Sequence, residues 1–314
     1  MIEKEQFEGA LLGLALGDAL GAPREGGLAE RLLWRLIGTT ARGEMRWTDD
    51  TQMSIDLAES LLAQGAVDAD DLARRFAASY RWSRGYGPGA AKLLKRIAAG
   101  RDWRQASRSV YPDGSYGNGG AMRSSVVGLF YARRPEAELL EAARLAASVT
   151  HAHPAGMEGA ALIAAATALA LRGVPPVELL ARMEQIAQLE PFAAQARAAA
   201  AWLQAGDPPS ARQVARTLGN GIAASASCMT AIYIAARFMR QPFADMLAFV
   251  ARCGGDVDTV GAMAGAVWGA AHALSSLPPD WLAKLEQKDR LIKLADALYL
   301  RSQALGGRAI ASKL

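Results

Sequence analysis

The sequence predicts an all-α protein that folds as one compact domain over residues 1–314. Segments rich in alanine and leucine, such as residues 139–148, 159–171 and 177–189, carry apolar side chains at spacings of three and four. This period is typical of helices, and alternating strand-like runs are almost absent. The breaks between these segments contain glycine and proline, but none is long or polar enough to be an interdomain linker.

The composition is that of a soluble globular protein. Hydrophobic residues make up 51% of the chain and charged residues 21%, which argues against disorder. The formal net charge is +4, but lysine and arginine are spread along the chain. A slightly positive solvated surface explains this charge better than a nucleic-acid tract does, so we expect no nucleic-acid partner.

Cysteines, histidines and the N-terminal residues do not indicate a secreted, zinc-binding or membrane protein. Cys228 and Cys253 form no C-x-x-C pair, and the chain has only three histidines. Residues 1–10 lack the apolar stretch of a signal peptide. The apolar run 160–171 is shorter than the roughly 20 residues that span a membrane. We therefore expect a cytoplasmic protein with no membrane partner. We also expect a monomer, although these features do not bear on the oligomeric state.

Two predicted helices carry glycine along one face. Glycine recurs every four residues from Gly9 to Gly21 and again from Gly261 to Gly269, and this spacing keeps the residues on one side of a helix. Each helical glycine costs about 1 kcal/mol relative to alanine. The repeats therefore indicate close approach of neighbouring helices. Whether these two helices also form the wall of a site stays open.

Acidic residues mark the start of two predicted helices. Thr48, Asp49 and Asp50 precede an apolar-periodic run, and segment 254–259 (GGDVDT) leads into a helix predicted over 260–274. Acidic and hydroxyl side chains at such positions are commonly caps, because they accept bonds from free backbone N–H groups. A cap needs one side chain, whereas each of these starts has two carboxylates.

Such a concentration of negative charge favours a bound cation. Carboxylate and hydroxyl oxygens, without a cysteine or histidine cluster, suit a hard ion such as Mg2+, Mn2+ or Ca2+. Asp256, Asp258 and Gly261 match three positions of an EF-hand loop, but Val267 stands where that loop needs a glutamate. A two-metal site shared by the two acidic segments fits better.

Three other features are candidate parts of a site. Glu25 lies in a loop with proline and glycine, either as a solvated carboxylate or as an acid or base above a site. The glycine-dense segment 113–123 would let the backbone approach a phosphate, but it matches neither the P-loop nor the dinucleotide fingerprint. His151 and His153 stand at a helix boundary, as ordinary boundary residues or with a ring against a ligand.

The chain resembles the ADP-ribosylglycohydrolase family in five segments that occur in order: LGLALGDALGAPRE, WTDDTQM, GSYGNGGAMR, THAHP and GGDVDTVGAMAGAVWGA. The resemblance extends from about Phe7 to segment 277–298. The family includes the dinitrogenase reductase-activating glycohydrolase and hydrolases of ADP-ribosylarginine and ADP-ribosylserine. Val257 is a departure, since threonine is common between the two aspartates; we expect this middle residue to point away from the ions.

The resemblance implies an orthogonal helical domain of the ADP-ribosylglycohydrolase type, with two Mg2+ or Mn2+ ions. Glu25 matches a loop glutamate that contacts the metal or the scissile region in some members, and His151 would lie near the adenosine. By motif position, the metal ligands would be Thr48, Asp49, Asp50, Asp256, Asp258 and Thr259. The diphosphate and ribose path would be lined by Gly114, Ser115, Tyr116, Gly117 and Asn118.

The implied function is hydrolysis of the glycosidic bond between ADP-ribose and a side chain of a protein or peptide, with ADP-ribose as product. Arginine is favoured over serine as the acceptor. The metals would hold ribose hydroxyls and orient a water. Glu25 or Asp50 would handle the proton, and replacing Asp258 should abolish activity.

Three alternatives remain on the sequence alone. The chain could bind ADP-ribose without hydrolysing it, could hydrolyse a small ADP-ribosylated or phosphorylated metabolite with a metal, or could be a structural helical protein whose acidic motifs are only caps. Release of AMP would indicate a phosphohydrolase. Stability that does not respond to Mg2+ or Mn2+ would indicate the structural protein.

Overall fold

The computed structural model describes residues 1–206 and 208–311, and helices form most of this part of the chain. Its only extended pairings there are isolated bridges, such as the one between Gly117 and Ala223. The all-α prediction is therefore confirmed. The α-helices are α1 (Lys4–Gly21), α2 (Leu28–Ile37), α3 (Asp49–Gln64), α4 (Ala69–Ser79), α5 (Pro88–Ala98), α6 (Trp103–Val110), α7 (Ser125–Tyr131), α8 (Glu136–Ser148), α9 (Pro154–Leu171), α10 (Pro176–Ile186), α11 (Glu190–Ala205), α12 (Ala211–Thr217), α13 (Cys228–Arg237), α14 (Phe243–Cys253), α15 (Val257–Ala271), α16 (Pro279–Leu282) and α17 (Lys288–Ala311). Short 3-10 helices are η1 (Ala22–Arg24), η2 (Trp82–Arg84), η3 (Asn118–Gly120), η4 (Ala224–Ala226) and η5 (Leu274–Ser276).

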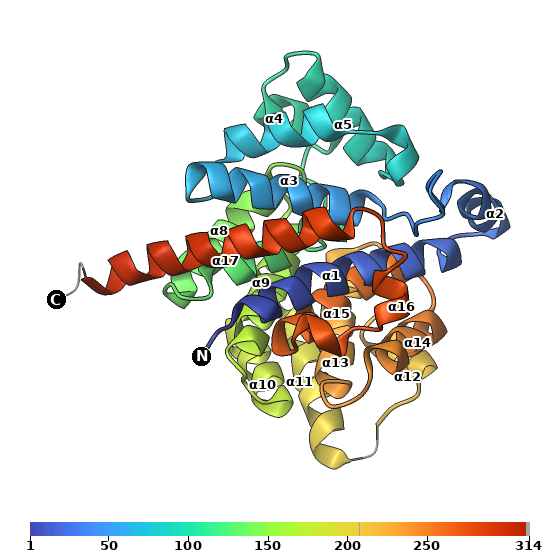
Figure 1. Cartoon of the computed structure of the whole chain (residues 1–314), viewed down its shortest axis with the longest axis vertical. Coiled ribbons are helices and arrows are strands. Elements are labelled where there is room, and N and C mark those ends of the chain that lie inside the picture. The colour runs from blue at the N-terminus through green and yellow to red at the C-terminus, as the bar shows by residue number, and fades with distance from the viewer. Residues whose placement is uncertain (207, 312–314) are drawn as a thin grey trace.

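The two glycine-faced helices, α1 and α15, pack directly on each other at the centre of the molecule (Figure 1). A Cβ built on Gly13 would lie against the carbonyl oxygen of Gly265, and one built on Gly17 against that of Gly261. The backbones therefore approach as closely as the repeats predict. At the end of this contact a Cβ on Gly21 would meet the backbone of Asp258, so the contact sets the C-terminal end of α1 beside the acidic start of α15.

The remaining helices enclose this pair. α17 crosses between α1 and α3, α4 and α5 lie beyond α3, and α10 to α14 occupy the opposite end (Figure 1). The main buried apolar cluster runs from Phe7 in α1 to Leu298 in α17. α9 is long and apolar enough to cross a membrane by length and composition, but 83% of its 18-residue window is buried inside the fold. It is therefore packed here as a core helix.

Helix boundaries follow the local capping chemistry. Thr48 caps α3 by accepting a bond from the Asp50 N–H, and the Gly65 backbone ends that helix in the left-handed region. Pro154 begins α9 inside the break predicted at residues 153–156, with the His153 side chain as its cap. α15 starts at Val257 rather than 260 and ends at Ala271 rather than 274.

Two other predicted segments need comment. The helix predicted over 177–189 ends at Ile186, because Ala187 is extended and Leu189 already precedes α11. The break predicted at 206–210 includes residue 207, which lies outside the described residues.

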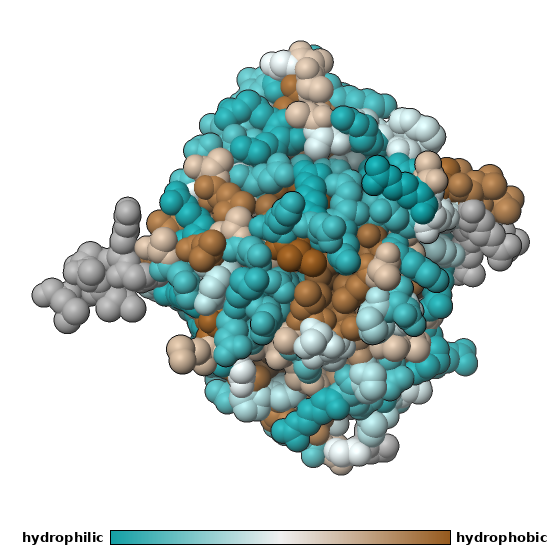
Figure 2. All heavy atoms as spheres, viewed as in Figure 1, coloured by the Kyte–Doolittle hydropathy of each residue, from teal (hydrophilic) through white to brown (hydrophobic). Residues whose placement is uncertain are grey.

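The surface in Figure 2 is largely hydrophilic, with apolar side chains at the edge where α2 lies. There Leu32, Leu33 and Leu36 are exposed. Cys228 and Cys253 are buried free thiols, so neither cysteine takes part in a disulfide.

Candidate active site

The two acidic helix starts and the loop after α1 meet in space. Carboxylate oxygens of Glu25, Asp256 and Asp258 lie within 4.8 Å of one another. Asp256 and Asp258 are buried, and Glu25 is half-buried. Asp50, at the start of α3, reaches the same place, because the Thr259 hydroxyl donates to its Oδ1 atom over 3.4 Å. Thus residues more than 200 positions apart form one acidic cluster, as the two-site interpretation predicted.

Asp50 shows most clearly that this cluster suits a cation. It is 2% exposed, and its Oδ2 atom has no hydrogen-bond partner among the described residues. Burying an unpaired carboxylate oxygen is unfavourable. Oxygen donors in this number and setting are those that Mg2+, Mn2+ or Ca2+ prefers. The residues present therefore fit a hard metal ion.

Electrostatics lead to the same conclusion. Burial, reinforced by the charges of Asp18, Glu25 and Asp256, raises the pKa of Asp49 to about 8. Burial and the surrounding carboxylates also raise the pKa of Asp50 well above its ordinary value. The pKa of Asp258 is raised in the same way. Without a cation the cluster opposes its own ionisation, and a bound cation would relieve this repulsion.

Asp18 is a part of the site that sequence reasoning missed. It is fully buried in α1, and its carboxylate accepts bonds from the Thr48 N–H at 2.9 Å and from the Thr51 N–H at 3.0 Å. It thereby fixes the start of α3 against α1. An aspartate inside an otherwise apolar, glycine-faced helix was the available signal, because a buried carboxylate requires partners.

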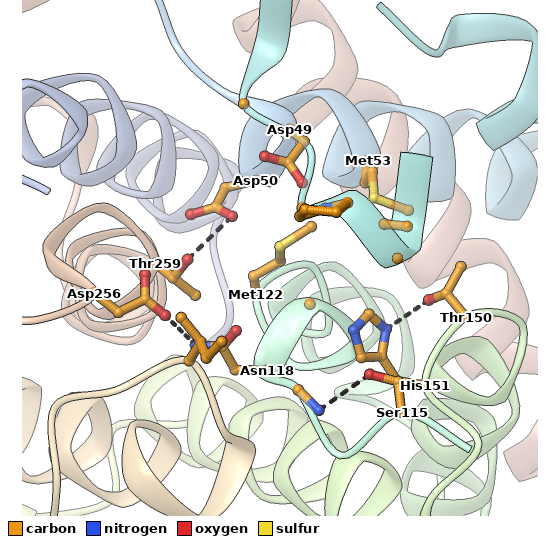
Figure 3. A pocket seen from close by; sticks show the side chains of 18 of the residues that line it. Asp49, Asp50, Met53, Ser115, Asn118, Met122, Thr150, His151, Asp256 and Thr259 are labelled. Carbon is orange, nitrogen blue, oxygen red and sulfur yellow. Dashed lines mark hydrogen bonds between the residues drawn. The ribbon is translucent and has the colours of Figure 1, made fainter. Parts of the chain in front are cut away.

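A cavity of about 250 Å3 opens beside the acidic cluster. Figure 3 shows Asp49, Asp50, Asp256 and Thr259 on one side of it and Ser115, Thr150 and His151 on the other. The cavity thus joins the acidic cluster to the glycine-dense segment and the histidine boundary. Of the residues predicted for the site, those that line it are Glu25, Asp49, Asp50, Ser115, Gly117, Asn118, His151, Asp256, Asp258 and Thr259.

Three predicted site residues do not line this cavity. Thr48 is buried and acts as the α3 cap, which is the capping role weighed above. Gly114 has a left-handed backbone and packs against the backbone of His153. Tyr116 is 61% exposed, with its ring edge-on to that of His153.

Asn118 faces the acidic cluster more than the sequence indicated. Its Nδ2 atom donates to Asp256 Oδ2 at 2.5 Å and to the Ser227 hydroxyl at 3.0 Å. The first bond holds the side chain of Asp256 at the start of α15, and the second orients the Asn118 amide that makes it. Asn118 therefore links the glycine-dense segment to the acidic cluster while also lining the cavity.

Much of the remaining cavity wall comes from residues whose own side chains carried no chemical signal. Residues 85–89 appeared only as a break between helices, yet Gly85, Gly87 and Pro88 line the cavity. Single apolar or aromatic side chains complete the wall, and only the folded chain brings them together. They are Met53, Leu93, Tyr111, Met122 and Ile222.

Known proteins resemble this chain over nearly its whole length. The profile of the ADP-ribosylglycohydrolase family matches residues 2–307. ADP-ribosylhydrolase ARH3 of Mus musculus is 34% identical, over 94% of this chain and 91% of its own. The ADP-ribosylarginine hydrolase Tri1 of Pseudomonas putida is 27% identical, over 95% of this chain and 79% of its own. A solved structure, described as an ADP-ribosylglycohydrolase-related protein complex, aligns with a TM-score of 0.66 and 30% identity, over 95% of this chain and 98% of that one.

Proposed function

The chain belongs to the ADP-ribosylglycohydrolase family, and from that premise we propose that it is a metal-dependent hydrolase that removes ADP-ribose from a modified protein side chain. The observation that carries this proposal is the buried, unpaired Oδ2 atom of Asp50 beside the carboxylates of Glu25, Asp256 and Asp258. A binding module without catalysis has no evident use for so unfavourable a cluster.

We propose that two Mg2+ or Mn2+ ions are held at this cluster. Their ligands would come from Asp49 and Asp50 at the start of α3 and from Asp256, Asp258 and Thr259 at the start of α15. Thr48 is the weakest of the predicted ligands, because its hydroxyl already accepts the bond that caps α3. When bound, the ions would supply Lewis acidity and a lowered pKa for a coordinated water.

The chain's own residues would bind and orient the substrate. Cleavage of a glycosidic bond passes through an oxocarbenium-like state, in which the leaving group takes up a proton. Glu25 is half-buried at the cavity edge and close to Asp256 and Asp258, so it is placed to exchange a proton with the leaving group or with water. The glycine-dense segment would run along the diphosphate and ribose, because Gly117 and Ser115 line the cavity opposite the acidic cluster.

The acceptor is an arginine nitrogen or a serine oxygen. The Tri1 relative is named for ADP-ribosylarginine, whereas the ARH3 name specifies no acceptor. The preference for arginine therefore stays a prediction, and the assay must include both linkages.

The deciding experiment incubates the protein with ADP-ribosyl-arginine and ADP-ribosyl-serine peptides in the presence of Mn2+ and identifies the products by mass. We expect intact ADP-ribose from one of the two peptides. Release of AMP would indicate a phosphohydrolase instead. ADP-ribose binding without any product would indicate a non-catalytic binding module.

A further inference from the structure

The glycine-dense segment ends in a buried arginine, Arg123, which forms no ion pair within 4.0 Å in the described part of the chain. Arg123 is 0% exposed, and its guanidinium lies over the ring of Phe76 at 4.7 Å. It donates to the carbonyl oxygen of Gly119, to that of Ala146 at 3.1 Å, and to the Thr150 hydroxyl at 2.9 Å. It therefore joins the glycine-dense segment to the C-terminal end of α8.

Thr150 in turn contacts His151, so it links Arg123 to the imidazole. Its Oγ1 atom lies 2.7 Å from the Nδ1 atom of His151 (Figure 3). A threonine hydroxyl has one hydrogen, and arginine can only donate, so Oγ1 accepts from Arg123. If Nδ1 also donated to it, the hydroxyl hydrogen would have no acceptor among the described residues, although Thr150 is buried. The satisfied arrangement has Thr150 donating to Nδ1, which places the imidazole proton on Nε2.

The Nε2 side of the ring belongs to the cavity. His151 lines it, and no hydrogen bond joins Nε2 to another described residue. A Cβ at Gly119 would meet the ring at 2.6 Å and one at Gly117 at 3.3 Å. Two glycines thus leave room for the imidazole beside the segment proposed to follow the diphosphate.

The charges around the ring support a neutral imidazole. Burial lowers the pKa of Arg123 to about 9, which leaves the guanidinium positive at neutral pH. Burial together with the charge of Arg123 lowers the pKa of His151 to about 3. The ring is then neutral at physiological pH, and a buried positive charge stands behind it. The positive charge of Arg123 favours an oxygen-rich, anionic ligand on the cavity side.

We propose that Arg123 and Thr150 are positioning residues that fix His151 as a neutral Nε2–H donor to a phosphate or ribose oxygen of ADP-ribose. The identity of this ligand rests on the proposed function. In this role Arg123 and Thr150 act through His151: they decide whether its imidazole offers a donor or an acceptor to the ligand. With the proton on Nδ1 instead, Nε2 would meet the ligand oxygen as a second acceptor, and the two would repel.

The tautomer is measured without any ligand, by long-range 1H–15N NMR of protein labelled at histidine. The chain has three histidines, and a His151→Gln variant assigns the signals of His151. We expect the Nε2-protonated neutral form throughout pH 5 to 8. An Nδ1-protonated ring, or titration at the ordinary pKa near 6.5, would overturn the proposal.

The variants Thr150→Val and Thr150→Ser separate the hydroxyl from the shape of the side chain. With valine, the proton should no longer be held on Nε2. ADP-ribose binding, measured by calorimetry, should weaken by about tenfold, and KM should rise by a larger factor than kcat falls. Serine should restore the tautomer and bring the affinity to within about threefold of wild type. An unchanged tautomer and affinity in the valine variant would contradict the proposal. If valine prevents folding, the wild-type spectrum and the serine variant decide.

The two proposals fail separately. If the wild-type protein binds no ADP-ribose, the proposed function is wrong, while the NMR spectrum still decides the tautomer. If ADP-ribose binds and is released from peptides but the ring is protonated on Nδ1, only the positioning role of Arg123 and Thr150 is lost.

Discussion

The carboxylate of Asp18 in α1 accepts both the backbone N–H and the hydroxyl of Thr51 in α3, at 3.0 and 2.5 Å. The Thr48 N–H adds a third donor. Burial raises the pKa of Asp18 to about 6, although the threonine donors act to lower it. This contact ties the first turn of α3 to α1, whose packing on α15 has already placed Asp258. The geometry of the acidic cluster therefore depends on Asp18.

Replacing Asp18 should loosen that tie. Asp18→Asn leaves one acceptor oxygen and places an NH2 group against a backbone donor, so we expect a loss of about 1–3 kcal/mol in the free energy of unfolding. Urea denaturation in the presence of a chelator measures it. Asp68→Asn is the matched control, because Asp68 caps α4 at an exposed position and asparagine caps equally well. Equal effects of the two changes would contradict this role of Asp18.

The contact between α1 and α15 leads to a second prediction. Alanine normally stabilises a helix by about 1 kcal/mol relative to glycine, but a methyl group on Gly13 would strike the backbone of Gly265. We expect Gly13→Ala to lower the free energy of unfolding by about 1–3 kcal/mol or more. Gly221→Ala is the control, since its Cβ would meet only the Ala226 Cβ, at 4.0 Å. A stabilised Gly13→Ala variant would show that the helices do not approach this closely.

The buried carboxylate of Asp56 should make the free energy of unfolding depend on pH. Burial raises its pKa from 3.8 to about 7, although bonds from Ser79 and Gln52 oppose the shift. The unfolded chain therefore ionises first, and folded stability is lost as the pH rises from about 4 to about 7. Urea denaturation of wild type and Asp56→Asn should show the variant gaining about 2–3 kcal/mol on wild type between pH 5 and pH 8. A constant difference between the two proteins would contradict the buried environment of Asp56.

Metal binding should stabilise the fold. A ligand at 100 times its Kd adds about 2.7 kcal/mol, so Mn2+ or Mg2+ should raise the Tm of the chelator-treated protein by several degrees. Asp256→Asn should lose most of this rise, because it removes a buried carboxylate from the cluster. Asp68→Asn, remote from the cluster, should keep it. A Tm that changes with neither Mn2+ nor Mg2+ would favour the alternative in which these aspartates are only caps.

Much of this architecture could be predicted from local sequence patterns. The four-residue glycine repeats predicted close approach of neighbouring helices, because only glycine lets helix backbones come so close, and the structure shows that the two repeats face each other in α1 and α15. The paired carboxylates at two helix starts predicted their convergence, because one cap does not need two charges. Both inferences start from residues that lie close together within one helix or at one helix start.

The remainder depended on contacts that no local pattern encodes. Asp18 is 30 and 33 positions from the two threonines that it binds, and Arg123 is 27 positions from Thr150. Some helix ends also differ from the prediction because a residue belongs to the next helix. Leu189, predicted to end one helix, is the N-terminal cap residue of α11. Residues 85–89 look like an ordinary break until the fold brings them to the cavity.

The most direct test of the central claim is metal-dependent release of ADP-ribose. Protein stripped with chelator should release none from the preferred peptide, and added Mn2+ or Mg2+ should restore release for wild type and for Asp68→Asn. Asp258→Asn should stay inactive at any metal concentration while remaining folded, because the cluster loses a buried carboxylate. Full activity in the presence of chelator, or in Asp258→Asn, would contradict a metal-dependent site at the starts of α3 and α15.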